Sequence, residues 1–172
     1  MSNPQSITPD AFEILVGREL RRIGIEPVQL RRVNVMHSYD HGGYGFDLQG
    51  RLEAYGRRWS VLIECHNRPL AVESSDVSAL RTRADNARAA SAVLFTTSGI
   101  DAGALAAARA DAIPLLRVVD AQTALMATGV IQAGQLPAWL PEYTIELVTS
   151  EGSRLLEASD PELLLRELRP QQ

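Results

Sequence analysis

The chain contains no lysine, because every one of its 17 basic residues is an arginine. Any mechanism that needs a catalytic lysine is therefore excluded. Cys65 is the single cysteine, so no internal disulfide can form and a disulfide-rich secreted scaffold is excluded. No stretch approaches the roughly 18 apolar residues of a membrane span, and the first ten residues lack the features of a signal peptide. We therefore expect a cytoplasmic protein without a membrane segment.

Length and composition predict one globular domain. The chain has 172 residues, of which 45% are hydrophobic, and this is enough to bury a core without disulfides or metals. The net charge of -4 argues mildly against a protein that coats nucleic acid with a uniformly positive surface. Residues 1–90 carry twelve Arg against eleven acids, whereas residues 91–172 carry five Arg against ten acids. A polyanion such as nucleic acid would therefore bind to residues 1–90 and not to the more acidic residues 91–172.

Hydrophobic periodicity predicts an α/β fold with a mixed sheet flanked by helices. Thr8 caps a first helix that Gly24 ends. A strand with a bulge at Arg31–Arg32 follows, and two further strands pair about a turn at Tyr55–Gly56. The remaining predicted core elements are a helix from Ser74 or Ser75 to about Ala89, a strand at 91–96, a helix at 101–110, a strand at 113–119 and a helix at 121–127.

The chain order predicts a core followed by a short extension. Residues 1–128 form the expected core, and 129–141, rich in Gly, Pro and Gln, is the expected linker. Residues 142–172 are predicted to form a hairpin around Glu151–Gly152 and a closing helix, packed on the core.

The predicted hairpin brings two acidic residues together. If Tyr55 and Gly56 are the turn residues, Asp47 lies directly opposite Glu64, and His66 emerges on the same face. Opposed side chains lie about 4.5–5.5 Å apart, where like charges are destabilising unless something positive lies between them. A divalent cation would remove the conflict. Carboxylates with water and phosphate suit Mg²⁺, so the pattern predicts phosphodiester hydrolysis.

The order of the elements resembles the Mrr-type family of restriction endonucleases over residues 11–120. Four segments carry the resemblance: Phe12–Glu13 with Leu20-x-x-Ile23-Gly24, GGYGFDLQG, VLIECHN and VLFTTSGI. The resemblance implies a restriction-endonuclease-like fold. It also implies a DNA endonuclease that depends on Mg²⁺ or Mn²⁺, of restriction or defence type.

The resemblance also implies roles for single residues. Asp47 and Glu64 would bind the metal, the Cys65 backbone carbonyl would be a third ligand, and Glu13 would help order the site. His66 stands where the family usually has lysine. A neutral imidazole with an ordinary pKa of about 6.5 could accept a proton from metal-bound water, but it supplies less positive charge. The candidate phosphate contacts are Arg68, Arg31 and Arg32.

A second function remains open on the same residues. The missing lysine and the acidic second half favour a non-catalytic domain that acts in DNA binding, self-association or regulation. For a nuclease, cutting both strands would usually require a homodimer, and a partner protein could supply sequence specificity because no base-reading element is evident.

Simpler interpretations compete with several of these assignments. Asp47 and Glu64 could be solvent-facing residues of an amphipathic hairpin, and the paired arginines could belong to solvated faces. Cys65 is best interpreted as a small apolar residue of a buried strand. A zinc site at His37, Asp40 and His41 is a weaker alternative, because such a run is usually a loop.

Overall fold

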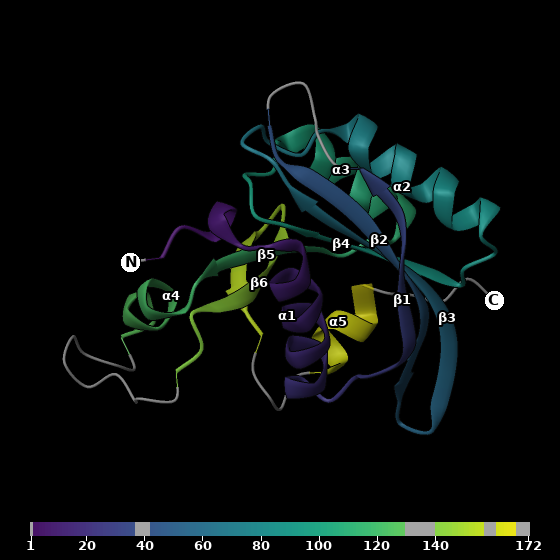
Figure 1. Cartoon of the computed structure of the whole chain (residues 1–172), viewed down its shortest axis with the longest axis horizontal. Coiled ribbons are helices and arrows are strands. Elements are labelled where there is room, and N and C mark those ends of the chain that lie inside the picture. Colours follow the sequence, from purple (N-terminus) through teal and green to yellow (C-terminus); the bar gives the residue numbers. More distant parts are fainter. Residues whose placement is uncertain (1, 37–41, 130–139, 157–160, 168–172) are drawn as a thin grey trace.

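The computed structural model describes residues 2–36, 42–129, 140–156 and 161–167. In these ranges one sheet is formed, with strands in the order β1-β2-β3-β4-β5-β6-β7 (Figure 1). The strands are β1 (Glu26–Met36), β2 (Tyr44–Ala54), β3 (Arg57–Asn67), β4 (Ser91–Thr96), β5 (Leu115–Asp120), β6 (Tyr143–Thr149) and β7 (Gly152–Leu155). The helices are a 3-10 turn (Pro4–Ser6), α1 (Pro9–Arg22), α2 (Ser74–Asn86), α3 (Ala102–Asp111), α4 (Ala121–Ala127) and α5 (Pro161–Glu167). No helix in the described ranges is long and apolar enough to cross a bilayer.

The sheet is mixed, as predicted. β1, β2 and β3 are antiparallel, β3, β4 and β5 are parallel, and β6 and β7 are again antiparallel. The parallel part requires crossover connections, which α2 and α3 supply. The predicted C-terminal hairpin is present, and β6 extends the main sheet by pairing with β5, which would otherwise be an unpaired edge. Most of the predicted linker lies outside the described residues.

Helices cover both faces of the sheet. α1 contributes Phe12 and Leu20 to a core that includes Phe46 and Ile63, whereas α2 and α3 pack over a second core that includes Leu62. Since side chains alternate along a strand, odd positions at this part of β3 face α1 and even positions face α2. This alternation sends Glu64 to the α2 face.

The turn between β2 and β3 has the predicted residues and the predicted register. Tyr55 and Gly56 have φ values of 51° and 72°, the positive values that a tight hairpin turn of this kind requires. Asp47 therefore pairs with Glu64, which confirms the predicted opposition.

β1 carries two irregularities instead of one predicted bulge. The first register shift lies between Val28 and Arg31, where Gln29 has a φ of 53°, so the bulge precedes the predicted Arg31–Arg32 position. The second lies between Val33 and Met36, where Asn34 has a φ of 51°. Both allow β1 to twist against β2.

Gly50 on β2 lies against the first bulge, and we expect Gly50→Ala to be destabilising. A methyl group there would be 2.8 Å from the Gln29 carbonyl oxygen and 2.9 Å from the Leu30 Cα atom. Overpacking of this kind costs about 1–3 kcal/mol of unfolding free energy. Urea unfolding should show the loss, whereas Gly99→Ala, whose methyl would have no atom within 4 Å, serves as the control. Equal unfolding midpoints for the two variants would contradict this description of the bulge.

Candidate active site

Two buried carboxylates lie side by side at the centre of the α2 face. Asp47 is 2% exposed and Glu64 is 8% exposed, and they are paired across β2 and β3. Both strands have neighbours on each side, so the backbone that carries the two acids is held by ladders in both directions. The interpretation of these acids as solvent-facing residues is therefore wrong.

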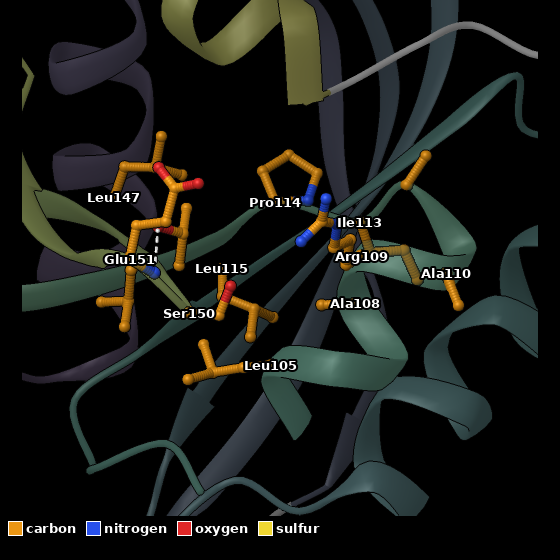
Figure 2. A pocket seen from close by; sticks show the side chains of 13 residues that line it. Leu105, Ala108, Arg109, Ala110, Ile113, Pro114, Leu115, Leu147, Ser150 and Glu151 are labelled. Carbon is orange, nitrogen blue, oxygen red and sulfur yellow. Dashed lines mark hydrogen bonds between the residues drawn. The ribbon is translucent and has the colours of Figure 1, made fainter. Parts of the chain in front are cut away.

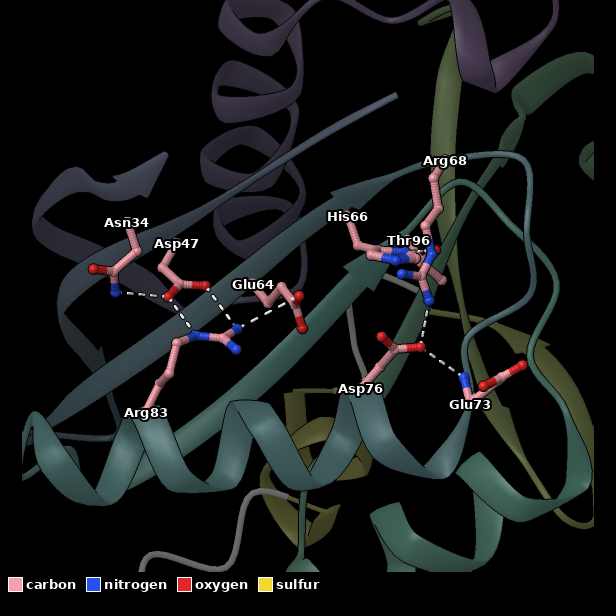
Figure 3. A network of polar contacts seen from close by, with 9 residues as sticks. All are labelled: Asn34, Asp47, Glu64, His66, Arg68, Glu73, Asp76, Arg83 and Thr96. Carbon is pink, nitrogen blue, oxygen red and sulfur yellow. Dashed lines mark hydrogen bonds and ion pairs between the residues drawn. The ribbon is translucent and has the colours of Figure 1, made fainter. Parts of the chain in front are cut away.

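An arginine from α2 lies between the two acids (Figure 3). The Arg83 Nε atom donates to Asp47 Oδ2 at 2.9 Å, and Nη2 donates to Asp47 Oδ1 at 3.1 Å. The same Nη2 atom is 3.4 Å from Glu64 Oε1. The positive charge that the paired acids require is thus supplied by the protein itself in this structure.

Sequence reasoning did not find Arg83, although α2 carries a signal for it. Asp76 and Arg83 are seven positions apart, so they lie on the same face of the helix, next to the buried Val77, Leu80 and Ala84. Charged residues that lie beside the buried face of a helix, as Asp76 and Arg83 do, indicate oppositely charged partners on the sheet against which the helix packs.

Asn34 is a second residue that the sequence did not identify. Its amide nitrogen donates to Asp47 Oδ2 at 2.9 Å, and it lies at the second irregularity of β1. Bulges next to functional sites often re-aim a side chain, and asparagine tolerates the positive φ that this position requires. The Asp47 carboxylate is therefore held by donors from both β1 and α2.

Glu64 is the less well satisfied of the two acids. Burial raises its pKa to about 7, while Arg83 acts to lower the pKa and Asp47 to raise it. Its Oε2 atom is buried and accepts no hydrogen bond. An unsatisfied carboxylate oxygen beside a second carboxylate is a suitable ligand for a hard cation.

His66 shares the strand with Glu64 but is enclosed. It has no exposed surface, and its Nδ1 atom is 3.0 Å from Thr96 Oγ1 on β4. Burial, assisted by Arg68, lowers the pKa of His66 to about 4. The imidazole is therefore neutral near pH 7, and its pKa is lower than the ordinary value assumed from the sequence.

Arg68 lies in the loop after β3 and forms an ion pair with Asp76 at the start of α2 (Figure 3). Asp76 also accepts a hydrogen bond of 2.8 Å from the Glu73 backbone N–H, as part of a capping box. The α2 helix thus places two charged contacts on this face, one at each end of the row formed by Glu64 and His66.

Glu13 and Arg32 lie on the other face of the sheet. Arg32 Nη2 donates to Glu13 at 2.7 Å, and the Arg32 guanidinium lies 4.7 Å from the ring centre of Phe46, which packs against α1. The structure therefore does not bring Glu13 or Arg32 to the Asp47–Glu64 pair. Arg31 is exposed on β1.

Cys65 is fully buried, and burial raises the pKa of its thiol well above the ordinary value. Its backbone is flanked by its register partners Phe46 and Phe95. These features suit a small apolar residue, as expected. The alternative zinc site falls outside the described residues, because 37–41 are not described.

The donor set is compatible with one hard divalent cation. Within the described ranges, no group of three His, Cys, Asp or Glu side chains converges on one point. Mg²⁺ is commonly held by one or two carboxylates, with water and phosphate oxygens in its other positions. The Asp47–Glu64 pair and the unsatisfied Glu64 oxygen meet that requirement, although Arg83 occupies the space between them.

A separate cavity of about 650 Å³ lies between the end of α3 and the β6–β7 turn (Figure 2). Its lining includes Leu105, Arg109, Ile113 and Leu147. It contains none of the predicted site residues and has no pair of opposed acids.

A mixed sheet with opposed acids on two adjacent strands, followed by a crossover helix, is the arrangement that the resemblance to restriction endonucleases predicts. The family model described as restriction endonuclease, of the Mrr type, matches residues 4–124. The chain belongs to this family, which confirms the resemblance found over residues 11–120.

One solved structure, the DNA modification-dependent restriction endonuclease AspBHI, is similar at 24% sequence identity and a TM-score of 0.34. The match covers 56% of this chain and 25% of that chain, so it spans about a quarter of the length of that protein. A search of curated proteins found no match.

The raised pKa of Glu64 predicts a pH-dependent stability that Glu64→Gln should remove. The folded protein keeps a proton that the unfolded chain releases above the ordinary pKa of 4.5. The stabilising contribution of Glu64 is therefore complete below pH 4.5 and is lost as the pH rises through about 7. Between pH 5 and 8 the Glu64→Gln variant should gain up to about 3 kcal/mol of unfolding free energy relative to wild type.

The measurement is urea unfolding at several pH values. Glu53→Gln is the control, because Glu53 lies on β2 but is 40% exposed and paired with Arg58. Parallel stability curves for wild type and Glu64→Gln would contradict the raised pKa.

Proposed function

We propose that the protein is a metal-dependent DNA endonuclease in which Asp47 and Glu64 hold Mg²⁺ or Mn²⁺. The observation that supports this most strongly is the opposition of two buried acids on central strands of a chain from a restriction endonuclease family. When bound there, the metal would polarise a phosphodiester and promote ionisation of water. The Cys65 backbone carbonyl, next to Glu64 in sequence, is the proposed third ligand.

The surrounding residues prepare the acids for this role. Asn34 and Arg83 hold the Asp47 carboxylate in one orientation through their hydrogen bonds. Glu64 releases its proton at a pH of about 7, and it becomes an anionic ligand above that value. Metal binding should therefore strengthen as the pH rises through neutrality.

His66 is the proposed base or water-orienting group. His66 lies two residues beyond Glu64 on β3, and its neutral ring is held by Thr96 on β4. Because the ring is fully buried, it can meet a water molecule only if its surroundings open, and opening of the nearby Arg68–Asp76 ion pair is the rearrangement proposed here. Arg68 would then be available to a DNA phosphate.

The remaining assignments extend this proposal. Arg31, on the exposed edge strand, and Arg32, on the α1 side, would contact the DNA backbone. Glu13 would support this contact by holding Arg32. Cleavage of both strands would be performed by a homodimer, since one site cuts one strand at a time. A partner protein would supply recognition of base sequence.

Plasmid cleavage tests the proposal. Incubation with Mg²⁺ or Mn²⁺ from pH 6 to 9 should convert supercoiled DNA to nicked and linear forms, with a rate that rises through pH 7. Asp47→Ala and Glu64→Ala should lower the rate at least about a hundredfold, because each removes a metal ligand. Glu53→Ala, on the same hairpin, should cleave as wild type does. No cleavage at any pH, or equal cleavage by Asp47→Ala, would refute the proposal.

A second function is supported by two specific observations. Arg83 already pairs with both acids, and His66 stands in place of lysine and is enclosed. Both suit a non-catalytic member of the family that acts in DNA binding, self-association or regulation. For such a protein, calorimetry should detect no binding of Mg²⁺ or Mn²⁺ to wild type. Binding that Glu64→Ala abolishes would contradict it, and cleavage created by His66→Lys would identify a decayed enzyme.

A further inference from the structure

Arg83 takes up most of the ligand capacity of the acid pair. Its guanidinium forms a two-point contact with both Asp47 oxygens and lies 3.4 Å from Glu64 Oε1. Glu64 Oε2 is buried and accepts no hydrogen bond. A metal ion that is held by both acids must therefore take oxygens that the guanidinium now contacts.

A metal ion at this position would compete with the guanidinium for the same carboxylate oxygens. Mg²⁺ binds oxygens at about 2.0–2.1 Å in a nearly octahedral arrangement, and a guanidinium adjacent to it would add like-charge repulsion. The side chain of Arg83 is 32% exposed and comes from a helix, so it can turn toward solvent without movement of the sheet. Asp47 and Glu64 themselves stay fixed by the β2–β3 ladder.

We propose that Arg83 is an exchangeable internal counterion, which competes with the divalent cation for the Asp47–Glu64 pair and must leave before metal can bind. This inference rests on the metal binding of the proposed function. In the metal-free protein Arg83 reduces the free-energy penalty of burying two acids without a positive partner. The site is therefore stable without metal, and the same contact limits the affinity for metal.

Metal affinity of the full chain provides the first test. Mn²⁺ binding is measured by titration calorimetry for wild type, Arg83→Gln and Arg81→Gln. Arg83→Gln should bind Mn²⁺ on the order of tenfold more tightly than wild type, because no charged hydrogen bonds have to be displaced. Arg81→Gln is the matched control, since Arg81 lies on the same helix and pairs with Asp85, and its affinity should equal that of wild type.

Thermal unfolding with and without Mn²⁺ provides a readout that does not depend on cleavage. Without metal, Arg83→Gln should melt below wild type, because the acids lose their counterion. Saturating Mn²⁺ should raise the melting temperature of Arg83→Gln more than that of wild type. Equal or weaker Mn²⁺ affinity of Arg83→Gln would overturn the inference.

A direct observation on wild type separates exchange from simple charge repulsion. In the metal-free protein the Arg83 Nε–H group is hydrogen-bonded to Asp47, so its NMR signal should exchange slowly with water. Saturation with Mg²⁺ should remove this protection, and a signal that stays protected would overturn the inference. If Arg83→Gln does not fold, this experiment and Arg83→Lys, which keeps the charge but loses the two-point contact, take its place. Arg83→Lys should bind Mn²⁺ more tightly than wild type, and no change would again overturn the inference.

The cleavage assay distinguishes the two failures. Cleavage by wild type together with unchanged affinity of Arg83→Gln would refute the role of Arg83 alone. Tighter Mn²⁺ binding by Arg83→Gln with no cleavage by either protein would support the role of Arg83 and refute the nuclease.

Discussion

The repulsion between two opposed, buried carboxylates is the constraint on which this site depends. The register of one hairpin places Asp47 against Glu64, and burial removes the water that would screen them. Such a pair needs a positive partner, and here the partner is Arg83. Burial raises the pKa of Glu64 to about 7, and Arg83, which makes its two hydrogen bonds to Asp47, offsets this only in part.

Helix α2 provides the polar lid over this face of the sheet. Asp76 engages Arg68 near His66, and Arg83 engages Glu64 on the same strand as His66 and Asp47 on the adjacent strand β2 (Figure 3). The apolar residues between these two charges pack on the sheet and hold α2 in place. The positions of both charges over the sheet are therefore set by this packing.

Two residues set the positive charge around the acids in opposite ways. His66 stands where the resemblance to the family predicts lysine, and its ring is neutral at pH 7. Arg83 supplies a permanent positive charge from a different element, helix α2. An arginine cannot serve as a base at neutral pH, so the contribution of Arg83 is its charge and its hydrogen bonds.

The sequence by itself determined the fold class, the order of elements through residue 127 and the opposition of Asp47 and Glu64. These follow from local signals: period-two alternation, a two-residue turn with glycine, and a capped first helix. The C-terminal hairpin was also predicted, but its place beside β5 in the same sheet was not, because strand partners distant in sequence leave no local mark.

Tertiary structure alone decided what surrounds the acids. Packing of α2 across the sheet brought Arg83 to residues 19 and 36 positions away in the chain, and a bulge in β1 aimed Asn34 at Asp47. It also placed Glu13 with Arg32 on the opposite face and enclosed His66. The periodicity of the sequence shows which face of a helix or strand is apolar. It does not show which partners the long polar side chains beside that face will contact, because these partners come from other elements that pack nearby only in the folded protein.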